Sequence, residues 1–331
     1  MAVATLSPCG YRQGEKSMAK TEIKINFMKY RKIAAGLSIF LVVCSFGSLL
    51  INQVNWGLDF TGGSLVEVAY DVSVAADDVR VQLDEAGFEG HVVQYFGSVR
   101  DVLVRIPPQK GLSEKENAFL GDKITEVLKA ASGDNVELRR SEFVGPAVGE
   151  ELANQGGLGL LAALAVVMLY IAFRFQLKFA VGAVVALFHD VAITLGAFSL
   201  ARWDFDLTVV AALLAVIGYS LNDTIVVSDR IRENFRKIRR GTSMEIINIS
   251  LNQTLGRTLV TSLTTLLVLF ALLVMGGELI RGFAIGLIIG VMIGTYSSIY
   301  IAANVLLAMN VNKEDLAIPV KEGSDDPDLV M

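Results

Sequence analysis

An acidic residue inside a membrane-length apolar segment is the feature of this sequence that most directly suggests chemistry. Asp223, preceded by Asn222, lies among Leu, Ile and Val in the run 207–227. A charged carboxylate near the centre of a membrane helix costs about 2.5–3.5 kcal/mol on insertion scales, so it usually has a partner or a function. Arg257 stands at the start of the next apolar run. An acid and a base that face each other in lipid indicate proton or ion transport.

Helix geometry predicts that these two side chains lie at similar depth. At 1.5 Å per residue, Asp223 lies about 24 Å from the outer end of its helix at Leu207. Arg257 lies about 28 Å from the outer end of the next helix at Gly276. The two side chains are therefore within reach of each other if their helices are neighbours. The alternative is that Arg257 extends to the cytoplasmic headgroups.

Other polar residues follow helical spacing around this pair. Tyr219 and Ser220 precede Asp223 by four and three residues and share its helix face. Arg257 and Thr261 form part of a polar stripe on the next helix. Such hydroxyls can hold a proton relay, but interhelical hydrogen bonds alone also account for them.

His189 and Asp190 fall near the middle of another apolar run. Histidine titrates near neutral pH, so these two residues and Asp223 are candidates for a proton path. The alternative is that Asp190 is a protonated or hydrogen-bonded packing contact. The chain has only two histidines and no ligand-spaced cluster, so we expect no metal site and no cofactor besides the proton as coupling ion.

Four glycines recur at four-residue spacing in the last apolar run. They are Gly282, Gly286, Gly290 and Gly294. A small continuous face of this kind allows close helix approach, and it predicts a packing surface. The spacing does not tell whether the face meets a helix of this chain or a partner subunit.

The composition places these residues in a membrane protein. Of the 331 residues, 53% are hydrophobic and only 19% are charged. Apolar runs long enough to span the hydrocarbon layer predict a polytopic α-helical protein with six transmembrane helices. The predicted segments are a tail 1–32, helices 33–51, 156–173, 179–200, 207–227, 258–275 and 283–307, an exported domain 52–155, a basic link 228–257 and a tail 308–331.

Lysine and arginine crowd the tail 1–32, the short link after the second helix and the link 228–257. By the positive-inside rule, both termini are cytoplasmic and the domain 52–155 is exported. The first apolar run is longer than a signal-peptide core, so we expect it to remain as a helix. Met18 is an alternative start. Cys9 and Cys44 both lie outside the exported domain, which therefore has no disulfide.

The exported domain reads as strand, helix, strand, strand, helix, strand. Alternating or β-branched runs predict the strands, apolar residues at helical spacing predict the first helix, and Ser113 with Glu116 forms a capping box that opens the second. This order is typical of a ferredoxin-like α+β fold. The predicted elements are strand 64–70, helix 74–86, strands 91–96 and 100–106, helix 113–131 and strand 135–144.

The exported domain is also acidic, with 18 Asp and Glu against 9 Lys and Arg between Asn52 and Glu151. This balance disfavours nucleic acid and anionic lipid as partners. It leaves a solvated face, or a docking surface for unfolded chains or a partner subunit. The glycine pair Gly62 and Gly63 predicts a helix-to-strand corner, and no stretch supplies a nucleotide-binding fingerprint.

Three motifs together resemble the SecF members of the SecD/SecF family of protein-export membrane proteins, within the RND superfamily. They are WGLDFTGG at 56–63, GYSLNDTIVVSDR at 218–230 and LNQTLGRT at 251–258. The resemblance implies an RND-type half in the bacterial inner membrane. It also implies that the chain works with SecD beside the SecYEG channel, with YajC and YidC as further partners. On this reading the proton motive force helps draw unfolded preproteins outward, without covalent catalysis.

The resemblance also implies roles for individual residues. Asp223 and Arg257 match the acid and the arginine linked to proton conduction in the family. The segment that supports or moves the exported domain maps to Gly57, Asp59, Phe60, Thr61, Gly62 and Gly63. Two other functions remain open from the residues alone. One is half of a proton-driven exporter of small molecules or lipids, and the other is a passive scaffold for translocon assembly.

Overall fold

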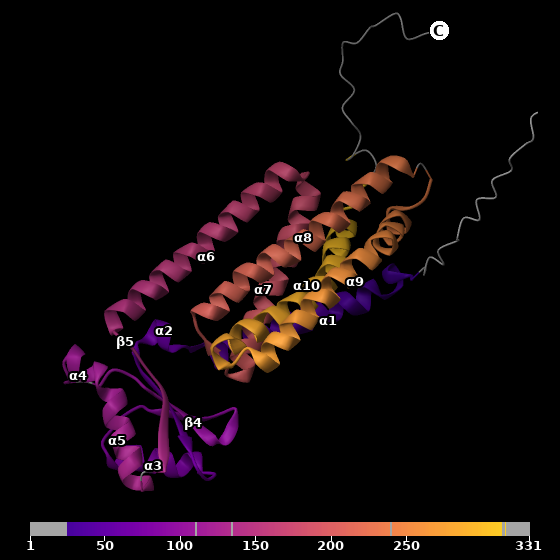
Figure 1. Ribbon diagram of the computed structural model, residues 1–331. Coiled ribbons are helices and arrows are strands. Elements are labelled where there is room, and N and C mark those ends of the chain that lie inside the picture. The colour runs from indigo at the N-terminus through magenta and orange to yellow at the C-terminus, as the bar shows by residue number, and fades with distance from the viewer. Residues whose placement is uncertain (1–24, 110, 134, 239, 313–314, 316–331) are drawn as a thin grey trace, which may run out of the picture.

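A computed structural model describes residues 25–109, 111–133, 135–238, 240–312 and 315. It has two parts, a bundle of long helices and a smaller α+β domain attached to one end of the bundle (Figure 1). Most of the predicted tails, 1–32 and 308–331, including Cys9 and Met18, lie outside the described residues.

Six helices of the bundle are long and apolar enough to cross a membrane, in agreement with the predicted number. A short 3-10 turn η1 (Phe27–Tyr30) leads into the first, and another, η2 (Glu278–Ile280), leads into the last. The helices are α1 (Arg31–Ile51), α6 (Pro146–Arg174), α7 (Leu177–Ala201), α8 (Leu207–Lys237), α9 (Ser243–Met275) and α10 (Arg281–Ala308).

Three helices extend well beyond their predicted membrane segments. α6 begins at Pro146, which suits the first turn of a helix because its missing N–H would be unpaired there anyway. α8 continues to Lys237, and α9 starts at a capping box formed by Thr242 and Glu245. Hydropathy detects only the apolar part of a helix, so the predicted link 228–257 is mostly helical, and residues 146–155 belong to α6 rather than to the α+β domain.

α10 occupies the centre of the bundle and packs against α8, α7, α9 and α1. α7 is the most enclosed helix, with 67% of its membrane-length window buried, whereas α6 has only 6% buried and stands apart in Figure 1. The start of α1 and the end of α10 lie together at the end away from the α+β domain, where Asn304 Nδ2 donates to Arg31 O at 3.1 Å.

The α+β domain contains one four-stranded antiparallel sheet in the order β3-β4-β2-β5. This order and the alternation of strands and helices confirm the predicted ferredoxin-like fold. The predicted second helix is broken at Phe119 into α4 and α5. The elements are β2 (Gly63–Tyr70), α3 (Ala76–Glu85), β3 (Val92–Phe96), β4 (Ser98–Ile106), α4 (Glu114–Ala118), α5 (Leu120–Ser132) and β5 (Val136–Val144).

Three short elements that the sequence did not predict join the domain to the bundle. β1 (Asn55–Trp56) pairs in parallel with β6 (Asp204–Phe205), and α2 (Leu58–Thr61) packs against the start of α6. β6 lies between α7 and α8. The segment that enters the domain is therefore fixed to the bundle before the sheet begins.

Candidate functional site

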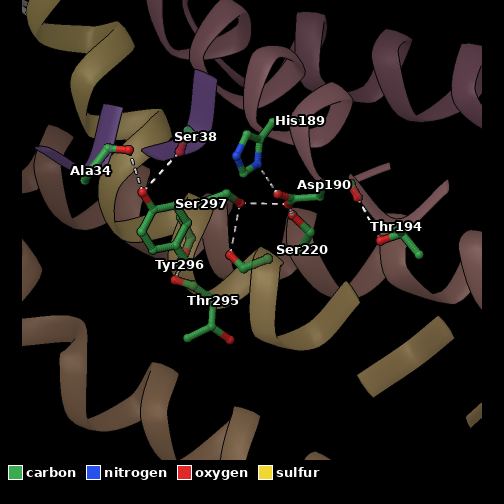
Figure 2. Close-up of polar contacts among 11 residues, drawn as sticks. Ala34, Ser38, His189, Asp190, Thr194, Ser220, Thr295, Tyr296 and Ser297 are labelled. Atoms are coloured by element: carbon green, nitrogen blue, oxygen red, sulfur yellow. Dashed lines mark hydrogen bonds and ion pairs between the residues drawn. The ribbon is translucent and has the colours of Figure 1, made fainter. Parts of the chain in front are cut away.

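Asp190 of α7 is the centre of a buried polar cluster inside the bundle, shown in Figure 2. The residue is 0% exposed. Its Oδ1 lies 2.8 Å from His189 Nδ1. Its Oδ2 accepts hydrogen bonds from Ser297 Oγ, at 2.7 Å, and from Ser220 Oγ. One carboxyl group therefore joins α7, α8 and α10.

Glycines of α10 permit the close helix approach that brings these hydroxyls to Asp190. A Cβ atom at Gly290 would lie 2.0 Å from Val216 Cγ2, which is too short for any real contact. Removing side chains from one surface is how membrane helices come close enough for side-chain hydrogen bonds. The glycine face meets α8 at successive turns: Gly282 against Val209, Gly286 against Ala212, Gly290 against Val216 and Gly294 against Ser220.

Tyr296 extends the cluster from α10 to α1. Its ring stacks on the His189 ring at a centroid distance of 6.3 Å. Its hydroxyl donates to Ala34 O at 2.7 Å and accepts from Ser38 Oγ at 3.1 Å (Figure 2). The sequence analysis missed Tyr296, Ser297 and Ser38. The available signal was the polar run 295–298, just after the last glycine of the face in a mostly apolar helix.

Asp223 is also buried, one turn beyond Ser220 on α8, but its environment differs. It is 3% exposed, and its Oδ2 has no hydrogen-bonding partner among the described residues. The hydroxyls of Thr224 and Thr258 are buried without a partner as well. α8 and α9 therefore carry buried polar atoms that have no hydrogen-bonding partner in the part of the chain that the structure describes.

Arg257 lies on the exposed surface of α9. α8 and α9 are packed neighbours, which was the condition for contact between Asp223 and Arg257. Among the described residues, however, the ion pairs within 4.0 Å do not include these two side chains. The expected pair is not closed in this structure, because one side chain turns inward and the other turns outward.

The remaining predicted relay residues do not join the Asp190 cluster. Tyr219 donates to Ser262 Oγ at 3.2 Å, in a separate contact between α8 and α9. Thr261 donates to carbonyls of its own helix, Arg257 O and Thr258 O. Asn222 is exposed. The structure thus brings together His189, Asp190 and Ser220. A role in proton transfer stays a prediction for all of the relay residues.

Asp59 connects the predicted domain-coupling motif to the bundle. Its Oδ2 accepts a hydrogen bond of 3.0 Å from Leu207 N, the first residue of α8. Helix N-termini carry unpaired N–H groups and favour a carboxylate. Asp206 adds the N-cap hydrogen bond, accepting from Val209 N at 2.9 Å. The start of the helix that carries Ser220 and Asp223 is therefore held by two carboxylates, one from each side of the junction.

The other members of the motif set the path of the chain at this junction. Gly62 and Gly63 have positive φ values of 66° and 121°, as the predicted corner requires, and Gly57 lies so close to Asp206 that a Cβ would come within 2.9 Å. The Phe60 ring stacks on Phe205 of β6, and Thr61 Oγ1 donates to Gly57 O at 3.1 Å. The motif attaches α2 to the end of the bundle that carries the α+β domain (Figure 1).

Arg105 of β4 is a junction residue that the sequence analysis did not identify. Its guanidinium donates to Trp56 O at 3.1 Å and forms an ion pair of 3.4 Å with Asp204 of β6. Burial raises the pKa of the Asp204 carboxyl; Arg105 opposes the shift and Asp206 adds to it. Arg105 is one of two arginines in a strand that is otherwise rich in valine, so little in the sequence singled it out.

No group of three or more His, Cys, Asp or Glu side chains that could hold a metal ion occurs in the part of the chain that the structure describes. The polar clusters of the bundle instead consist of carboxyl, imidazole and hydroxyl groups. Each of these groups can donate or accept a hydrogen bond in at least one of its states.

The fold and these buried groups define a class, the polytopic membrane proteins that carry one ferredoxin-like domain after the first helix. Comparison with known families then identifies the family. The model described as "Protein export membrane protein SecD/SecF, C-terminal" matches residues 123–312, and the "SecD/SecF GG Motif" matches residues 47–74. The chain belongs to the SecD/SecF family.

Similar proteins agree with this assignment. The chain is 49% identical to Protein translocase subunit SecF of Vibrio alginolyticus, over 92% of this chain and 97% of that one. It is 51% identical to the same subunit of Pseudomonas aeruginosa, over 91% of this chain and 97% of that one. These matches confirm the resemblance to SecF, so the chain is a multi-pass membrane protein with a SecF-like role in protein export.

A solved structure shares the architecture. The crystal structure of SecDF, a translocon-associated membrane protein from Thermus thermophilus, superimposes with a TM-score of 0.76 at 38% identity. The match covers 87% of this chain but only 39% of that one. The name SecDF combines SecD and SecF, in keeping with SecD as the partner in the Sec translocon.

Proposed function

We propose that this SecF-like subunit uses the proton motive force together with SecD to promote export of unfolded preproteins through SecYEG, and that Asp223 takes up and releases the coupling proton. The observation that carries the proposal is the buried Asp223 carboxyl, whose Oδ2 has no hydrogen-bonding partner. A buried carboxylate without a partner is costly, so the neutral and the charged forms differ in the packing that they favour.

Arg257 is the group that stabilises the charged form. Its side chain is on the neighbouring helix and exposed, so it is free to move toward Asp223 when the acid loses its proton. Each closing and opening of this pair changes how α8 packs on α9. One charge that crosses 100 mV supplies about 2.3 kcal/mol, which shifts a two-state equilibrium tens-fold.

Ser220 relates this event to the Asp190 cluster. It lies three residues before Asp223 on α8 and donates to Asp190, so a shift of α8 changes hydrogen bonds shared by α7, α8 and α10. His189 and Asp190 serve here as the internal end of a proton path or as its fixed support. Protonation of Asp223 is thereby coupled to the whole bundle.

The orientation of the chain is part of the proposal. Arg174, Lys178 and Arg230 lie toward the ends of α6, α7 and α8 that face away from the α+β domain. The positive-inside rule favours the cytoplasmic side for that end, and hence a periplasmic α+β domain and cytoplasmic termini in the bacterial inner membrane. YajC and YidC are further partners in this proposal, and no covalent catalysis is involved.

Proton flux into vesicles that contain the full chain with its partner subunit tests the role of Asp223. Asp223→Asn should abolish flux and the proton-dependent stimulation of export, while membrane insertion stays intact. Glu151→Gln is the control, since Glu151 is an exposed acid on α6 that contacts only Gln155 among the contacts described. Wild-type flux and export in Asp223→Asn would disprove proton coupling at this residue and favour a passive scaffold.

A further inference from the structure

Arg105 makes a contact that crosses from the body of the α+β domain to the bundle. It stands in β4, which is paired on both sides, by β3 and by β2. Its guanidinium reaches Trp56 O at 3.1 Å, Asp204 Oδ1 at 3.4 Å and Asn55 Oδ1 at 3.5 Å. A displacement of this side chain is therefore transmitted through β4 to β3 and β2, which pair with it.

Asp204 lies directly before the helix that carries the proposed proton site. Only Phe205 and Asp206 separate it from Leu207, the first residue of α8. Asn55 Nδ2 also donates to Asp204 Oδ1, at 2.5 Å, so β1 and β6 are locked together at this carboxylate. A displacement of α8 along its axis moves Asp204 with it. Arg105 is a residue of the α+β domain that contacts Asp204, so it would transmit this displacement to the sheet.

The contacts of Arg105 with Asp204 and Asn55 have features that allow them to break and form again. The two bonds of Arg105 to the side chains of Asp204 and Asn55 are at the long end of hydrogen-bond geometry. The Arg105 and Asp204 side chains retain 18% and 35% exposure, so water can replace the contact. Both line a cavity of 470 Å³ between the uncovered face of the sheet and the outer ends of the helices, which leaves space for the domain to move.

We propose that Arg105 and Asp204 form a releasable latch that transmits movement of α8 to the α+β domain, with Arg105 as a positioning residue for export. The latch rests on the proposed function, because it needs a helix whose position responds to the proton. It adds a requirement that the membrane site alone does not have: a charge pair outside the membrane that must both close and open.

A charge-reversal cycle tests the closed state of the latch in vesicles that contain the full chain with its partner subunit. Arg105→Asp and Asp204→Arg should each lower proton-dependent export by about fivefold or more, since each replaces an attraction by a repulsion. The double variant should recover at least half of the wild-type export. Arg139→Asp is the matched control, because Arg139 is exposed on β5 and pairs with Glu137 of its own strand; it should export normally.

Measurement of proton flux distinguishes the role of the latch from the role of the membrane site at Asp223. Arg105→Asp should keep wild-type flux while export falls, because the bundle still works but no longer moves the domain. Normal export in both single variants, or a double variant as defective as the singles, would overturn the latch, and so would a loss of flux in Arg105→Asp. A failure of the proposed function would appear differently, as wild-type flux in Asp223→Asn, while the charge cycle would still report on export.

A reversible cross-link tests whether the latch must also open. In a chain with Cys9→Ser and Cys44→Ser, Arg105→Cys and Asp204→Cys are joined by a short reducible thiol cross-linker. Export should stop when the link forms and return when it is reduced to the level of the unlinked double-cysteine chain. Undiminished export with the link in place would show that the contact is a fixed support, and the latch would be rejected.

Discussion

Asp190 and Asp223 are buried acids on adjacent helices of the bundle, and they differ in their hydrogen bonding. Asp190 is bonded by groups from its own helix and from two others. Asp223 has an oxygen without a hydrogen-bonding partner, and its expected cation, Arg257, is on the exposed surface of α9. Both residues were candidates for a proton path, and a packing contact was the alternative for Asp190; only Asp190 is held by hydrogen bonds from several helices.

This difference separates an acid that organises the bundle from an acid that can change state. A buried carboxyl whose partners come from three helices stabilises one packing of those helices, and its loss leaves several hydroxyl groups unpaired. A buried carboxyl without partners does not favour one packing of the helices. A change in its charge can therefore change how the helices pack. Under the proposed function, the same residue type therefore has two different roles on neighbouring helices.

Replacing each acid by leucine should give the largest contrast in stability. Asp190→Leu removes the contacts that Ser220, Ser297 and the His189 imidazole make with the carboxyl group. We expect a loss of about 3 kcal/mol in the free energy of unfolding. Asp223→Leu removes an unsatisfied carboxyl, so its stability should change by less than about 1 kcal/mol or improve. Unfolding of both variants in detergent measures the difference; equal losses would remove the distinction.

A single methyl group on the glycine face should disturb the Asp190 cluster selectively. Gly290→Ala places a Cβ against Val216 and forces α8 and α10 apart, at an expected cost of about 2 kcal/mol in unfolding free energy. Gly218→Ala is the matched control on α8, since its Cβ would meet nothing within 4 Å. We expect the control to be neutral or stabilising by about 0.5–1 kcal/mol. If Gly290→Ala behaved like the control, the close approach would not be what positions Ser220 and Ser297.

Much of this architecture was predictable because it depends on repeated, local signals. Apolar runs gave the six membrane helices, and alternation with a capping box gave the ferredoxin-like domain. The polar extensions of α6, α8 and α9 were missed because their residues are not apolar, and hydropathy detects only the apolar part of a helix. The helices nevertheless continue past that part. The short elements β1, α2 and β6 carry too few residues for any period to appear.

The candidate sites were predictable in residue type but not in partnership. Asp190 and Asp223 stand out because acids are costly in apolar helices. Which hydroxyls reach them depends on helix rotation, and the sequence cannot give this: Ser220 turns to Asp190, whereas Tyr219 turns to Ser262. Arg105 was missed because its partner Asp204 is 99 residues away along the chain.

Removing the contact of Tyr296 with α1 should disturb the Asp190 cluster less than replacing Asp190 itself. Tyr296→Phe keeps the ring beside His189 but removes the hydrogen bonds with Ala34 O and Ser38 Oγ. We expect a loss of about 1 kcal/mol in unfolding free energy and little change in proton flux. Abolished flux in a stably folded Tyr296→Phe would mean that the cluster itself carries the proton rather than supporting the helices.

Arg257 should give the smallest change in stability and a large change in function. Because it is exposed and its ion pair with Asp223 is open, Arg257→Gln should alter the unfolding free energy of the isolated chain by no more than about 0.5 kcal/mol. The same variant should lose proton flux in vesicles with the partner subunit, because the charged form of Asp223 would lack its cation. Arg139→Gln, an exposed arginine of the α+β domain, serves as the control for both measurements. A large loss of stability in Arg257→Gln would show that the pair is closed in the resting protein, and Asp223 would then belong with Asp190 as an acid that holds helices together.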